Sequence, residues 1–163
     1  MLYEFGNVRN SMHPQYEAFL VDDSVFHWKV VMCGPKSEID NSDPSPYNDG
    51  VFVLNVLFPP DYPATPPECR FKNILHVNVN SHGKICHDLL SRAWDRDYSM
   101  SHVLNSIYAL LLVPEVNSPV QSTLAALYHT NPAEYIAKIK AHVFENASKP
   151  LGTVVALVMK GQI

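Results

Sequence analysis

The 163-residue sequence has few cationic residues, few cysteines and no long apolar run, and each shortage excludes a class of protein. Its 12 Lys and Arg against 16 Asp and Glu give a formal charge of -4, so the basic surface of a nucleic-acid binder is missing. The longest apolar runs, residues 53–60 and 154–159, fall well short of the ~20 residues that cross a bilayer. We therefore expect a soluble protein that binds neither nucleic acid nor membranes.

Only three cysteines are present, Cys33, Cys69 and Cys86, and no two of them form a Cys-x-x-Cys pair. The odd number argues against a disulfide framework, and no charged and then apolar leader precedes them. These absences are typical of a reducing compartment. We therefore expect a cytoplasmic or nuclear protein.

The first half of the chain has the pattern of strands. Runs of β-branched and aromatic residues, bounded by Gly, Pro, Asn and Asp, predict strands at residues 25–33 and 51–58, with a short one at 68–71. Residues 34–50 lack an apolar period and are expected to form a mobile surface loop. The five prolines within residues 59–67 predict an ordered turn.

The second half changes to helical periodicity. Apolar residues three and four apart predict a buried helix that follows Ser99 as its N-cap. Ser118 and Asn131 each precede a proline and a later Gln or Glu, the pattern of a capping box at a helix start. Strands followed by three helices, with 47% apolar residues and no repeat, predict a single α+β domain.

Residues 71–94 carry most of the functional information. Cys86 follows a polar loop that contains Asn78, and such a loop can hold a thiol outside regular structure with amide donors nearby. A thiolate is a strong nucleophile that needs no metal. From the residues alone, a buried structural thiol is the commoner role for a cysteine, and it is the one we expect for Cys33 and Cys69.

Several motifs, taken in order, resemble the ubiquitin-conjugating enzyme family over about residues 19–147. The resemblance is carried by the proline-rich segment 58–67, by His76-Val77-Asn78-Val79-Asn80 before Gly83-Lys84-Ile85-Cys86, and by Trp94, Pro114, Pro119, Tyr128 and Tyr135. It implies a UBC-like fold, an antiparallel four-stranded meander with helices packed at one face and at the C-terminal end. Residues 1–147 would form the catalytic core, with an abbreviated first helix, and residues 148–163 a C-terminal tail.

The resemblance also implies a chemistry. Cys86 would carry ubiquitin or a ubiquitin-like modifier as a thioester, and Asn78 would stabilise the oxyanion that forms when an amine attacks. His76 would brace the Asn78 loop through hydrogen bonds without shuttling protons. The implied partners are the modifier, an activating enzyme, a ligase and a protein substrate. No cofactor is expected, because the activating enzyme uses the ATP.

Some positions near Cys86 depart from the family pattern. Val77 stands where a proline usually rigidifies the loop. Asn117 and Ser118 stand where many relatives carry acidic residues that help the acceptor lysine lose its proton. His87 replaces a common leucine, and we expect its imidazole to tune the thiol or to aid the acceptor. These three polar residues are therefore expected to shape the approach of the acceptor.

The expected ligase surface also departs from the pattern. Ala64, after Pro63, replaces a large aromatic residue that relatives insert into ligases, and Asp95, Arg96 and Asp97 replace a small Ser-Pro-Ala run. An interface without its aromatic anchor and with three charges does not fit the same apolar groove. We expect a dedicated ligase to be used, or common ligases to be rejected.

Three further classes of protein fit some of these residues. The departures would suit a catalytically weak or inactive relative that acts as a binding module in a ubiquitin-pathway complex. Zinc bound by His76, His82, Cys86 and His87 is disfavoured, because these spacings match no common ligand pattern. A cysteine peptidase would need a base held by a third group, and the sequence singles none out.

Overall fold

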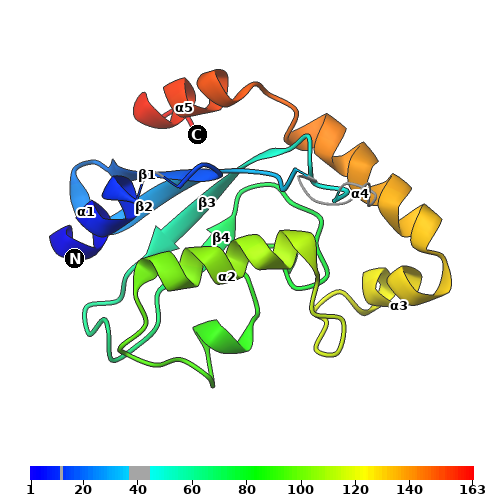
Figure 1. Cartoon of the computed structure of the whole chain (residues 1–163), viewed down its shortest axis with the longest axis horizontal. Helices are drawn as coiled ribbons and strands as arrows, with labels where there is room; N and C mark the ends of the chain where they lie inside the picture. Colours follow the sequence, from blue (N-terminus) through cyan, green and yellow to red (C-terminus); the bar gives the residue numbers. More distant parts are fainter. Residues whose placement is uncertain (12, 37–44) are drawn as a thin grey trace.

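The computed structural model describes residues 1–11, 13–36 and 45–163. Four strands form one antiparallel meander in the order β1-β2-β3-β4, with α2 across one face and α5 on the other (Figure 1). The strands are β1 Tyr16–Val21, β2 Ser24–Cys33, β3 Val51–Leu57 and β4 Glu68–Phe71. The helices are α1 Leu2–Asn10, η1 Asp88–Leu90, α2 Met100–Leu112, α3 Ser122–Thr130, α4 Pro132–Asn146 and α5 Leu151–Met159.

The three strands predicted from residue pattern are present, and β1 completes the sheet. Val21 pairs with Ser24, so a two-residue turn of Asp22 and Asp23 joins β1 to β2. Both aspartates have positive φ, 51° and 56°, as the type I′ hairpin turn requires. The loop expected at 34–50 falls mostly on residues 37–44, which lie outside the described residues.

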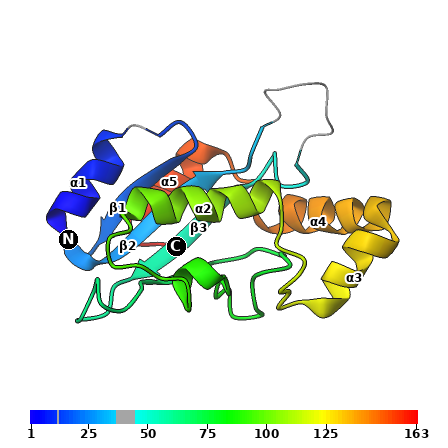
Figure 2. The same cartoon turned by 60° about the horizontal axis from the view of Figure 1, so that its bottom comes forward.

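The main core lies between the sheet and α2, which crosses in front of it in Figure 2. Trp28 pairs with Val56 and Val30 with Leu54, and all four side chains are fully buried. The α2 residues spaced three and four apart meet them: Met100, Val103, Leu104, Ile107 and Leu111. Burying a Leu or Ile side chain stabilises the fold by about 2 kcal/mol, so this layer fixes the position of everything attached to it.

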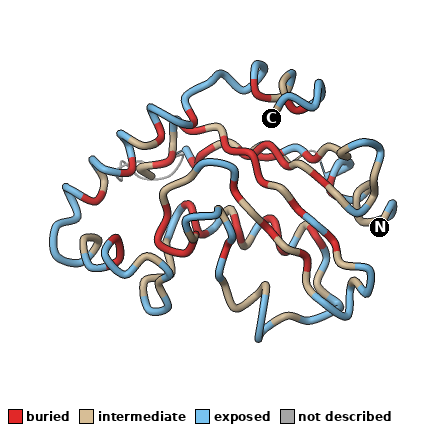
Figure 3. Tube along the Cα trace, turned by 180° about the vertical axis from the view of Figure 1, so that it is seen from behind, coloured by how far each residue is buried: buried red, intermediate tan, exposed pale blue. Residues whose placement is uncertain are grey.

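The opposite face of the sheet has its own small core. Val31 and Val53 are cross-strand partners there, and Val154 and Val158 of α5 pack onto them. In Figure 3 the buried part of α5 is the side that faces the sheet. The apolar stretch at residues 154–159 therefore lies in a helix packed against the body. Among the described residues, no helix is both long and apolar enough to cross a membrane.

Two of the three predicted helix caps are confirmed and one is wrong. Ser99 Oγ accepts the His102 N–H at 3.2 Å, and Asn131 Oδ1 accepts the Glu134 N–H at 3.2 Å. The helix expected after Ser118 begins only at Ser122, and its N-cap residue makes no side-chain cap. Hydrogen bonds to the loop around Asn78 cause this later start of α3.

Residues just before α3 bind that polar loop and so stay out of the helix. The N–H groups of Val120 and Gln121 both donate to the Val77 carbonyl at 3.0 Å. The Gln121 side chain donates to the Val79 carbonyl at 2.8 Å. These bonds satisfy donors that a helix start would leave free, so α3 begins after them.

Candidate active site

Cys86 is displayed at the surface at the end of a short segment that pairs with β4. The Ile85 N–H donates to the Cys69 carbonyl at 3.0 Å, and the Cys86 N–H donates to the Asn78 carbonyl at 2.9 Å. Ile85 is buried whereas Cys86 is exposed. The segment is therefore anchored by one side chain while the next residue presents its thiol to solvent.

A tight turn before this segment needs glycine. Gly83 has φ of +78°, and a Cβ there would overlap the Phe71 carbonyl oxygen. The Asn80 side chain closes the same turn, since its Oδ1 accepts the N–H groups of His82 at 2.9 Å and Lys84 at 3.0 Å. The turn lets the chain double back along β4 toward Cys86.

His76 lies buried beneath the loop and binds it at two points. Its Nδ1 accepts the Asn78 N–H at 3.0 Å, which leaves Nε2–H to donate to the Leu110 carbonyl at 2.9 Å. Burial lowers the pKa of His76 to about 4, against the opposing effect of the Leu110 bond. The ring is therefore neutral near pH 7 and ties the loop to α2, as the family resemblance implied.

The Asn78 side chain joins two loops. Its Nδ2 donates to the Glu115 carbonyl at 2.8 Å, and its Oδ1 accepts the Glu115 N–H at 2.9 Å. Asn78 is fully buried. We call this pair of bonds the Asn78 clip. In this structure the carboxamide is a link within the protein, so its expected role toward an oxyanion stays a prediction.

His87 lies between the nucleophile and the loop that follows α2. Its Nδ1 accepts the Leu89 N–H at 3.1 Å, so it caps η1, and its Nε2 lies 3.3 Å from the Glu115 carboxylate. Sequence reasoning missed Glu115, because it sought acidic residues at positions 117 and 118. Asn117 and Ser118 are exposed in the same loop. The loop therefore does contain an acidic residue, Glu115, but it lies two residues before position 117.

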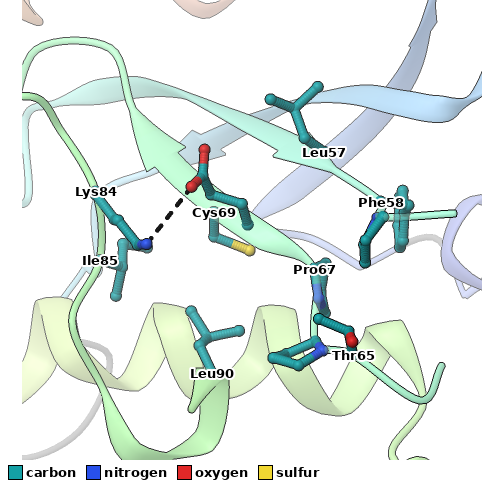
Figure 4. Close-up of a pocket in the computed structure, with 11 residues that line it drawn as sticks. Leu57, Phe58, Thr65, Pro67, Cys69, Lys84, Ile85 and Leu90 are labelled. Carbon is teal, nitrogen blue, oxygen red and sulfur yellow. Dashed lines mark ion pairs between the residues drawn. The ribbon is translucent and has the colours of Figure 1, made fainter. Parts of the chain in front are cut away.

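A charged cluster lies on the β4 side of Cys86. Glu68 accepts from Arg70 Nε at 2.6 Å. It also lies 3.5 Å from Lys84 Nζ, the contact drawn as a dashed line in Figure 4. The hydrogen bond to Glu68 is the main cause that raises the pKa of Arg70. Glu68 and Lys84 border an open pocket of about 380 Å³ whose wall includes the buried Cys69.

The residues expected to contact a ligase come from two loops that the fold brings together. Trp94 Nε1 donates to the Pro63 carbonyl at 2.9 Å, which ties the loop after the tryptophan to the proline-rich turn. Five residues stand exposed around this link: Pro63, Ala64, Asp95, Arg96 and Asp97. They form one surface, which we call the charged edge.

The described part of the chain contains no cluster of three or more His, Cys, Asp or Glu side chains arranged to hold a metal. Both ring nitrogens of His76 are used by protein groups, which removes it from any ligand set with Cys86. Cys33 is partly exposed at the end of β2, and Cys69 is buried in β4.

An exposed cysteine on a loop braced by buried polar residues, at the edge of a four-stranded meander, defines a class of α+β domain that displays a thiol on a fixed loop. A family model described as "Ubiquitin-conjugating enzyme" matches residues 1–143. The chain is 33% identical over 147 residues to "Probable bifunctional E2/E3 enzyme R795" of Acanthamoeba polyphaga mimivirus. That match covers 90% of this chain and 11% of the relative. The chain belongs to the ubiquitin-conjugating enzyme family.

Proposed function

We propose that this chain is an active ubiquitin-conjugating enzyme that carries ubiquitin or a ubiquitin-like modifier as a thioester on Cys86. The observation that supports this most is the exposed thiol directly after the buried Ile85, on a segment whose main chain is hydrogen-bonded to Cys69 and Asn78. A nucleophile needs both access and a fixed position. The three unpaired cysteines fit action in the cytoplasm or nucleus.

Charging is an exchange of thioesters. The Cys86 thiolate attacks the carbonyl carbon of the modifier's terminal thioester on the activating enzyme. A new C–S bond to Cys86 forms as the bond to the activating enzyme's sulfur breaks, and that sulfur leaves as a thiolate. One thioester replaces another, so this step needs no ATP or other cofactor on this chain.

Transfer forms an amide. The acceptor nitrogen attacks the same carbonyl carbon, the C–N bond forms, the C–S bond to Cys86 breaks, and the nitrogen gives up a proton. Asn78 would donate its amide to the oxygen that becomes negative, a contact worth about 10²–10³ in rate. Because Asn78 is buried against Glu115, this donation requires the loop after α2 to move away from the Asn78 side chain.

The proposed partners follow from two surfaces, the one that displays Cys86 and the charged edge. The activating enzyme and the modifier must reach Cys86, and a ligase would meet the charged edge. With three charged residues and no large aromatic there, the matching ligase surface is polar and not an apolar groove. If common ligases do not bind this chain, the charged edge is the cause, and the charging of Cys86 is unaffected.

A charging reaction with activating enzyme, ATP and a panel of modifiers tests the proposal. Wild-type protein is expected to form a band that reducing agent removes, and Cys86→Ser to form an ester that survives it. Cys86→Ala is expected to form none. Cys33→Ala is the matched control, since it removes a partly exposed thiol that lies in β2 and not in the Asn78 loop. A band that persists in Cys86→Ala would contradict the proposal.

A non-catalytic binding module is the second candidate. The observation that favours it is the Asn78 clip, which occupies both polar ends of the side chain that catalysis needs. The same charging panel separates the two. If no modifier is loaded, but the folded protein still binds ubiquitin or a ligase in a titration, the binding module is the better candidate.

A further inference from the structure

Four residues form a closed circuit of contacts around the nucleophile. The Cys86 N–H binds the Asn78 carbonyl, and the Asn78 side chain binds the Glu115 main chain. The Glu115 carboxylate then lies 3.3 Å from the ring of His87, which is bonded covalently to Cys86. The circuit places a carboxylate against the side chain of the residue that directly follows the nucleophile.

The Glu115 carboxylate is accessible as well as fixed. Its side chain is 37% exposed, so an incoming amine can reach it. The His87 ring is held in turn by the Leu89 N–H, which keeps the Nε2 hydrogen directed at the carboxylate side. Arg92 also acts on Glu115 through its charge, but its guanidinium is paired with Asp88 at 2.6 Å.

We propose that Glu115 is the base that takes the proton of the acceptor amine during transfer, and that His87 is the residue that positions it. This inference rests on the proposed function of Cys86. It also gives a reason for the missing acids at positions 117 and 118, because the carboxylate is supplied from position 115.

The proton follows a balanced path. A neutral acceptor amine attacks the thioester carbon, and the nitrogen in the tetrahedral intermediate carries a positive charge. The Glu115 carboxylate takes one proton from this nitrogen, so the amine no longer leaves easily. The C–S bond then breaks, Cys86 departs as a thiolate, and the Glu115 carboxyl releases its proton to solvent. General-base assistance of this kind contributes about 10²-fold or more to rate.

The test uses protein that has already been charged with ubiquitin, freed of activating enzyme, and mixed with free lysine. Glu115→Gln is expected to discharge about 10²-fold more slowly per charged molecule. Asn78 binds only main-chain atoms of Glu115, so the substitution keeps the clip. Glu145→Gln, which removes an exposed carboxylate of α4, is the matched control and should discharge like wild type.

Hydroxylamine separates a base from a structural role. Its nitrogen is much less basic than that of lysine, so it loses its proton to water without help. Discharge of Glu115→Gln to hydroxylamine is expected to stay within about twofold of wild type, whereas a disturbed loop would slow both nucleophiles alike.

Unchanged discharge of Glu115→Gln to lysine would overturn the inference, and so would equal losses with both nucleophiles. Either result leaves the thioester on Cys86 unaffected. Failure of the wild-type protein to charge would instead refute the proposed function itself, so the two failures are distinguishable.

Discussion

Cys69 and Cys86 belong to two segments that pair with each other, and yet their surroundings differ completely. Cys69 lies in β4 and is 1% exposed, and burial, with a smaller effect from Glu68, raises the pKa of its thiol to about 12. Cys86 lies one residue beyond the paired Ile85 and is exposed. Access to solvent therefore separates the two thiols, while buried polar residues nearby keep the accessible one in place.

Alkylation should give the largest contrast between the two regions. Iodoacetamide is expected to modify Cys86 at least about 10²-fold faster than Cys69, because only a thiolate that solvent can reach reacts. Peptide mapping by mass spectrometry measures both sites in one sample. Modification of Cys69 at a comparable rate in the folded protein would mean that β4 opens readily. That result would contradict the burial of Cys69 described above.

Acid should weaken the buried support beneath Cys86. The folded protein holds His76 neutral down to about pH 4, whereas the unfolded chain protonates it near pH 6.5. The neutral ring therefore contributes about 3 kcal/mol to the free energy of unfolding above pH 6.5. This contribution is lost as the pH falls toward 4. Urea unfolding at pH 7 and pH 4.5 measures the loss.

Two variants sharpen that measurement. His76→Gln should flatten the pH dependence, since it removes the titrating ring. His82→Gln, in an exposed turn, is the control and should leave the dependence unchanged. If His76→Gln keeps the full acid loss, then His13 and His142, whose pKa values burial also lowers, are the source.

Breaking the Asn78 clip should destabilise the fold by less than the protonation of His76 does. Asn78→Ala removes two hydrogen bonds and leaves the Glu115 N–H and carbonyl without these partners, so a loss of about 2 kcal/mol in unfolding free energy is expected. Chemical denaturation measures it. Asn117→Ala, an exposed asparagine in the same loop, is the control and should change stability by less than about 0.5 kcal/mol. Equal effects of the two variants would mean that the clip does not support the loop.

The smallest effect is expected at His87. Its contact with Glu115 is partly exposed, and surface contacts of this kind are worth about 1 kcal/mol or less. His87→Ala should therefore slow discharge to free lysine by at most about fivefold between pH 6 and pH 8. A rate unchanged across that range would show that His87 takes no part in transfer.

The elements that follow from local pattern could be predicted from the sequence. The β-branched and aromatic runs of β2 and β3 and the three- and four-residue spacing of α2 predict those elements directly. The cap at Asn131 needs only its own neighbours. The family resemblance supplied the rest of the meander.

The elements that depend on distant residues could not be predicted in this way. α1 is made of weak helix formers with Gly6 inside, but Phe5 packs edge-on to Trp28 and Glu4 accepts the Met100 N–H at 3.0 Å. The delayed start of α3 depends on bonds to Val77, a residue far away in the sequence that no local motif identifies. Tertiary contacts override local preference in both cases.

The residues of the site also divide into those that a local motif predicts and those that only the fold brings together. Cys86, Asn78 and His76 stand in one motif, so their proximity was expected. Glu115 joins them only because the fold brings the loop after α2 onto Asn78. The useful signal was the single acid in an otherwise uncharged loop of residues 113–119.

The most direct measurement of the central claim is the mass of the protein after charging with ubiquitin, followed by mapping of the modified peptide. We predict an added mass of one modifier less one water, placed on Cys86 and released by thiol. The same mass found on Cys33, or on a lysine with Cys86 left free, would contradict the claim.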